Sequence, residues 1–171
     1  MRRLFARRDS PPAITGMPKD ERIVSWADSF GGEVVAATRR GLWWPTDDTH
    51  RLIGWQYVDK AVWRDEALTV VEAEVVDDLL LVDRAPIAVR VENPRDLPAT
   101  VRKRVEGNVV RSELQPVPGG SARFVARRLP GEDGLAMWVR LEPGTRDEPE
   151  LREHLRARIA LWRQQWEAAL R

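Results

Sequence analysis

The feature that most constrains this chain is a series of short apolar runs between residues 22 and 91, each bounded by a turn signal. The runs are rich in valine, isoleucine, leucine and tryptophan, and glycine or proline interrupts them. Runs of this length are too short for helices, and β-branched and aromatic residues favour strands. The pattern predicts an antiparallel β-barrel or sandwich with hairpin turns at residues 65–67 and 84–86.

The hydrophobic period changes after residue 93. Leu97, Val101 and Val105 recur at every fourth position, while charged residues occupy the other faces. This spacing predicts an amphipathic helix over residues 96–106. We expect its apolar stripe to close one open end of the sheet.

A second portion follows the predicted helix. Residues 108–141 contain three more strand-like runs, separated by turn signals at 118–120 and 131–134. The long C-terminal helix has an apolar face formed by Leu151, Leu155, Ile159, Trp162, Trp166 and Leu170. We therefore expect an α+β protein with three parts: a basic arm (residues 1–17), a barrel capped by one helix (residues 18–107), and C-terminal strands plus a helix packed on the barrel (residues 108–171).

Two segments of the predicted barrel resemble a known arrangement. Residues 35–43 read Val-Ala-Ala-Thr-Arg-Arg-Gly-Leu-Trp, and residues 52–58 read Leu-Ile-Gly-Trp-Gln-Tyr-Val. Followed by further strands and one helix, they resemble the pleckstrin-homology-like (PH-like) barrel of bacterial proteins, and the chain is similar to a family of small actinobacterial proteins. The resemblance covers about residues 22–107, and Gly54 stands where the pattern commonly has proline.

The resemblance implies a recognition module for lipid headgroups, peptides or partner proteins, with Thr38 and an arginine bracing the turn of one hairpin. Lipid-binding members of this class carry basic residues in the loop between the first two strands. Here residues 28–33 contain no basic residue and two acidic ones. The resemblance therefore does not support a phosphoinositide-binding role.

Composition narrows the function further. The absence of cysteine excludes disulfides, thiol catalysis and zinc–thiolate sites. The 28 Lys plus Arg against 27 Asp plus Glu give a net charge of +1, which does not favour a polyanion-binding molecule as a whole. The only histidines, His50 and His154, and the five serines lie in no metal-binding or nucleophile motif. We expect no enzymatic activity, no cofactor and no metal site.

The candidate contact residues lie in two places. The arm carries four arginines around a Leu-Phe pair, and Trp43-Trp44 are consecutive in a predicted strand. Consecutive strand residues point to opposite faces, so we expect one indole to face outward or to be covered by the C-terminal portion. The candidate residues for contact with a partner or membrane are Arg2, Arg3, Leu4, Phe5, Arg7, Arg8, Trp43 and Trp44.

Three functional interpretations follow. The first is a cytoplasmic, non-enzymatic adaptor that engages a protein partner, because no secretory signal or membrane-spanning run is present. In the second, the basic arm holds this adaptor at the anionic inner face of the membrane; the alternative for the arm is a disordered tail. The third is nucleic-acid binding, with residues 102–104, Arg123 and residues 127–128 merging with the arm into one basic face and tryptophans stacking on bases.

Overall fold

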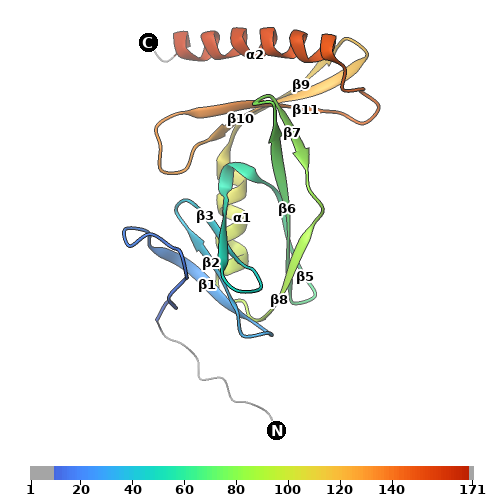
Figure 1. The fold of residues 1–171 in the computed structure, drawn as a ribbon. Helices are drawn as coiled ribbons and strands as arrows, with labels where there is room; N and C mark the ends of the chain where they lie inside the picture. The colour runs from blue at the N-terminus through green and yellow to red at the C-terminus, as the bar shows by residue number, and fades with distance from the viewer. Residues whose placement is uncertain (1–9, 170–171) are drawn as a thin grey trace.

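The computed structural model describes residues 10–169, which form an α+β fold with a mostly antiparallel, open sheet of 11 strands and two α-helices (Figure 1). The first part contains β1 (Ile23–Ser29), β2 (Val34–Thr38), β3 (Gly41–Pro45), β4 (His50–Gly54), the 3-10 turn η1 (Trp55–Tyr57), β5 (Val58–Arg64), β6 (Ala67–Val76), β7 (Leu80–Asp83), β8 (Ile87–Asn93) and α1 (Leu97–Asn108). The second part contains β9 (Val109–Val117), β10 (Gly120–Arg128), β11 (Leu135–Leu141) and α2 (Pro149–Ala169).

The strands lie in the order β4-β3-β2-β1-β8-β6-β7-β11-β10-β9, and β5 pairs with β6 beside this path. Asp65 and Glu66 join β5 to β6, and Asp77 and Asp78 join β6 to β7, all with positive φ. Two consecutive residues with positive φ are typical of the type I′ turn, whose twist matches that of a hairpin. The predicted hairpin around residues 65–67 is therefore confirmed.

The predicted hairpin at residues 84–86 is wrong. β7 and β8 both pair antiparallel with β6, β7 with its C-terminal half and β8 with its N-terminal half. Residues 84–86 are thus an interruption in one long line of pairing, where Pro86 has no N–H to donate to a ladder. The chain already reverses at Asp77 and Asp78, so no second reversal is needed.

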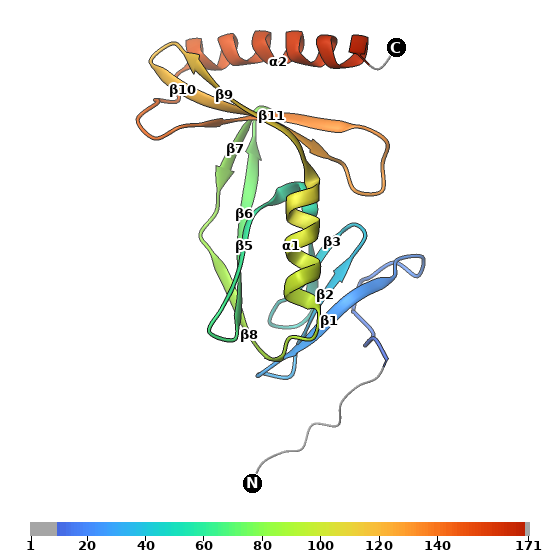
Figure 2. The ribbon, with the colours of Figure 1, turned by 180° about the vertical axis from the view of Figure 1, so that it is seen from behind.

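The first core lies where α1 packs against the sheet formed by β1–β6 and β8 (Figure 2). The stripe residues Leu97 and Val101 are at most 1% exposed and Val105 packs against the same cluster, which confirms the predicted stripe. The sheet does not close into the expected barrel: β4 ends the sheet and β5 pairs only with β6 in the described chain. α1 contacts β5, η1, β1 and β2, and so covers the core beside this opening.

The second core belongs to the C-terminal portion. β9, β10 and β11 form an antiparallel sheet that joins the first part through a parallel contact between Val139 of β11 and Leu80 of β7. Phe124 and Leu155 are at most 1% exposed at the centre of the cluster between this sheet and α2. Both views show α2 on the side of the sheet turned away from α1 (Figures 1 and 2). The helix thus packs on this sheet, and Arg152 of α2 also pairs with Asp77 in the β6–β7 turn of the first part.

Candidate functional site

The predicted contact residues lie either outside the described chain or in buried positions of β3. Arg2, Arg3, Leu4, Phe5, Arg7 and Arg8 lie outside the described residues. Trp43 and Trp44 point to opposite faces, as expected, but they are only 6% and 7% exposed. The prediction that one indole faces outward or lies under the C-terminal portion is wrong, because Trp44 belongs to the first core and the N-terminal segment around Ile14 and Met17 covers Trp43.

Two arginines of the predicted basic face, Arg123 and Arg127, make contacts within the fold. Arg127 is 3% exposed and points into the molecule, while Arg123 pairs with Glu142 at 3.3 Å. None of the eight tryptophans is fully exposed: five are buried and three half-buried, all within the described chain. The structure therefore offers no exposed indole on which a base would stack.

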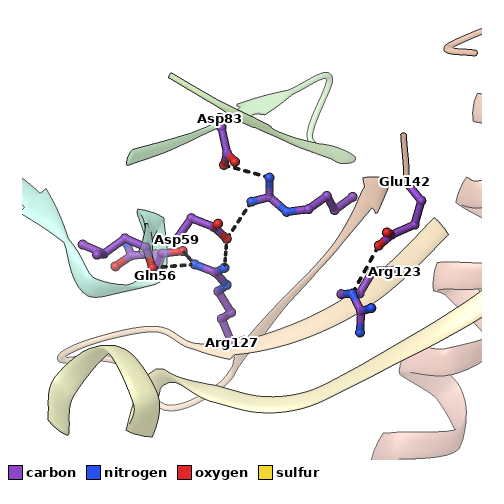
Figure 3. Close-up of polar contacts among 8 residues, drawn as sticks. Gln56, Asp59, Asp83, Arg123, Arg127 and Glu142 are labelled. Atoms are coloured by element: carbon purple, nitrogen blue, oxygen red, sulfur yellow. Dashed lines mark hydrogen bonds and ion pairs between the residues drawn. The ribbon is translucent and has the colours of Figure 1, made fainter. Parts of the chain in front are cut away.

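Arg127 joins the C-terminal sheet to the first part of the chain (Figure 3). Its Nη1 donates to the carbonyl oxygens of Gln56 and Val58 at 3.0 and 3.1 Å, and its Nη2 donates to Asp59 Oδ1 at 3.0 Å. Burial lowers the pKa of the Arg127 guanidinium below its ordinary value, and the negative charge of Asp59 opposes this shift. The guanidinium is kept in the interior by hydrogen bonds and one counter-charge.

Asp59 is shared by two strands of the C-terminal sheet. Arg140 of β11 donates to the same Oδ1 at 2.7 Å and pairs with Asp83 at 2.7 Å (Figure 3). Beside this network, the rings of Tyr57 and Trp138 stack with centroids 5.9 Å apart. The two parts of the fold thus meet through a polar network and an aromatic pair. These contacts fix how the surfaces of the two parts lie relative to each other.

A groove of about 710 Å³, here named the junction groove, opens where the two parts meet. It lies between the C-terminal half of α1, the turn after β2 and the β10–β11 loop (residues 129–134). A Cβ atom built on Gly131 of this loop would lie 3.9 Å from Arg40 Cγ in the β2–β3 turn, so the loop bounds the groove on that side. Its polar lining includes Arg39, Lys103, Arg104, Asn108 and Arg128.

A second groove of about 450 Å³, here named the edge groove, lies between β5 and the start of α1. Val62 and Trp63 line it from β5, and Pro98, Ala99 and Arg102 line it from α1. Val62 is 38% exposed, and β5 pairs only with β6 among residues 10–169. One side of this strand therefore has no strand partner in that range, and α1 contacts the strand.

Sequence reasoning missed both grooves. The basic run at residues 102–104 and Arg128 were visible as charges, but only the fold brings Lys103, Arg104 and Arg128 around one hollow. Asn108 carried no signal beyond its place at a helix end.

Metal ligands and membrane-spanning helices were also sought among the described residues. No group of three or more His, Cys, Asp or Glu residues in it is placed to hold a metal ion. Between residues 10 and 169, no helix is both long enough and apolar enough to cross a membrane.

The resemblance to PH-like barrels predicted that Thr38 braces a hairpin turn, and the contacts at this turn agree. Thr38 Oγ1 accepts hydrogen bonds from the backbone N–H groups of Arg40 and Gly41 at 3.2 and 3.3 Å. Such bracing is common to many tight turns and does not define a family. In comparisons with known proteins, no protein-family model, no curated protein and no solved structure matches this chain.

Proposed function

We propose that the protein is a non-enzymatic, cytoplasmic adaptor with a PH-like first part, and that it binds an extended segment of a protein partner along β5 in the edge groove. The observation that carries the proposal is an edge strand with one unpaired side next to an apolar groove. A peptide that adds to such an edge gains main-chain hydrogen bonds, and the adjoining pocket selects its side chains.

The chemistry of β5 indicates the kind of segment. A register shift between Val58 and Lys60 disturbs the start of the strand, so residues 60–64 are the part suited to regular pairing. Lys60 and Arg64 are exposed, and Trp63 offers a half-buried ring in the groove. The fitting partner segment is extended, with an apolar side chain for the groove and an acidic side chain opposite these cations.

A peptide selection tests this proposal. A library of displayed random peptides is panned against the full chain, and the affinities of the selected peptides are then measured for Val62→Lys and for the control Val82→Lys. Both valines are exposed strand residues, at 38% and 48%, but only Val62 lines the edge groove.

We expect Val62→Lys to weaken the selected peptides about tenfold, equivalent to about 1.4 kcal/mol, and Val82→Lys to leave them unchanged. Equal affinities for both variants, or a selection that yields no binder, would contradict the proposal.

Membrane attachment and nucleic-acid binding are tested separately. If the arm attaches the protein to membranes, deleting residues 1–10 lowers sedimentation with anionic vesicles; unchanged partitioning rejects that role. If the protein binds nucleic acid, the affinity for a fluorescent oligonucleotide falls steeply with salt. Salt-independent or absent binding rejects that alternative.

A further inference from the structure

The junction groove holds cations that the fold itself does not use. Within the described chain, Arg39, Lys103, Arg104 and Arg128 line the groove, and their side chains form no ion pair or hydrogen bond with another residue. Many other arginines do have such a partner; Arg51, for example, pairs with Glu72 at 2.8 Å. Unpaired cations gathered around one hollow favour an anionic ligand.

Two carboxylates also line the groove. Glu132 and Asp133 lie on the β10–β11 loop and are exposed. Four cations against two carboxylates leave a positive excess at this site. The carboxylates are on the loop, next to Arg128 at the end of β10, whereas Lys103 and Arg104 are on α1 and Arg39 directly follows β2.

Asn108 forms the floor of the groove. Asn108 is 5% exposed, its Nδ2 donates to the Arg128 carbonyl oxygen at 2.9 Å, and its Oδ1 is buried without a hydrogen-bond partner. Asn108 is also the last residue of α1, and the final carbonyls of a helix have no partners within it and carry the negative end of its dipole. These acceptors favour a ligand that carries hydrogen-bond donors in addition to its anionic group.

The groove also has apolar lining residues, and its space is small. Val24, Leu129 and Pro130 line it, and Val24 is 50% exposed. A volume of about 710 Å³ falls within the range of small-molecule sites. Because the β10–β11 loop bounds the groove, the site suits a small ligand better than a polymer that must run through it.

We propose that the junction groove binds a small phosphate ester whose other end carries N–H or O–H donors, the chemistry shared by nucleotides and sugar phosphates. The phosphate lies among the side chains of Arg39, Lys103, Arg104 and Arg128, which donate charge-assisted hydrogen bonds to its oxygens. The donor end approaches the Asn108 floor, and the ring or sugar rests on the apolar lining residues. This site is separate from the edge groove and does not depend on peptide binding there.

The test is an NMR titration of the full chain. The probes are adenosine monophosphate, ribose 5-phosphate, adenosine, inorganic phosphate and a hexaglutamate peptide. We expect at least one phosphate ester to bind with a Kd of about 1 mM or tighter and to shift the amides of residues 103–108 and 128–134. Binding by both esters indicates a sugar-phosphate site, and binding by the nucleotide alone indicates that the base is recognised.

Several results would overturn the proposal. They are the absence of ester binding up to about 10 mM, binding by inorganic phosphate as tight as by the esters, tighter binding of adenosine, and preference for hexaglutamate. Binding of inorganic phosphate alone would indicate an adventitious anion site. Preferred binding of hexaglutamate would indicate a peptide site.

Matched variants place the ligand in the groove. Lys103→Gln and Arg128→Gln each remove an exposed groove cation, and Arg163→Gln removes an exposed cation from α2. We expect each groove variant to weaken the ester about tenfold and the α2 variant to leave it unchanged, with the amide spectrum of each variant confirming its fold. Equal weakening by all three variants would reduce the effect to overall charge and reject the site.

Discussion

Removing the carboxylate of Asp59 tests whether the polar network holds the two parts of the fold together. Asp59→Ala leaves Arg127, whose side chain is 4% exposed, without its counter-charge, although its hydrogen bonds to the Gln56 and Val58 carbonyls remain. Loss of one partner of a buried ion pair costs about 3–5 kcal/mol. Because the Asp59 side chain is itself 27% exposed, we expect a loss near the lower end, about 3 kcal/mol.

The assay is urea unfolding followed by tryptophan fluorescence, with Arg127→Met and the double variant completing a cycle. Arg127→Met removes the donor to the Gln56 and Val58 carbonyls but leaves Asp59 bonded to Arg140, so we expect a loss of about 2–3 kcal/mol. The double variant should lose less than the sum of the single losses by at least about 1 kcal/mol.

The control for this cycle is Asp83→Ala. The Asp83 side chain is 43% exposed and pairs only with Arg140 among the described residues, so its removal should cost less than about 1 kcal/mol. A loss below about 1 kcal/mol for Asp59→Ala, or strict additivity in the cycle, would refute the interpretation of this network as the joint between the two parts.

Three further predictions concern packing and charge. Leu155 is fully buried in α2, so Leu155→Ala should lower the free energy of unfolding by about 2–5 kcal/mol. Leu161, in the same helix, is 55% exposed, so Leu161→Ala should lower it by less than about 0.5 kcal/mol. Equal losses would contradict the packing of α2. Gly41→Ala places a Cβ 2.2 Å from the Ile53 carbonyl oxygen and should lower the free energy of urea unfolding by about 1–3 kcal/mol. Gly107→Ala in α1 meets no atom within 4 Å and should raise it by about 0.5–1 kcal/mol. A neutral Gly41→Ala would contradict the β3–β4 register. The hydrogen bond from Ser29 lowers the pKa of the Glu33 carboxyl. The contribution of this carboxylate to the free energy of unfolding is therefore present above the unfolded-state pKa and is lost as the pH falls through the folded-state pKa. NMR titration of Ser29→Ala should show the pKa of Glu33 rising towards its ordinary value, and an unchanged pKa would assign the shift to another cause.

Local sequence patterns predicted much of the fold because helix faces and hairpin turns depend on residues that are close in the sequence. The fourfold spacing of Leu97, Val101 and Val105 reported a buried helix face, and the Asp65 turn reported a hairpin. The break at residues 84–86 was misread because Pro86 signals an interrupted ladder as well as a turn. Only the pairing of β7 with β6 decides between an interrupted ladder and a turn, and that pairing follows from the turn at Asp77.

Long-range placement was beyond local patterns. Nothing near Trp43 indicates that residues 14–26 fold over it, and the parallel contact between β7 and β11 joins segments about 60 residues apart. Arg127 and Arg128 did carry a usable signal, because adjacent strand residues face opposite sides and one of the two had to point inward. The unpaired side of β5 depends on the strand pairing of the first part, and the junction groove depends on how the two parts meet, so both required the structure.

Amide hydrogen exchange along β5 tests the central claim, that a partner segment adds to this strand, most directly. The exchange rates of residues 60–64 are compared with and without a selected peptide, with the β4 edge as an internal reference. We expect the peptide to slow exchange at those residues by about tenfold or more, since new main-chain hydrogen bonds protect the amides there, and to leave exchange in β4 unchanged. Unchanged exchange along β5 at saturating peptide, or protection confined to β4 or β9, would contradict it.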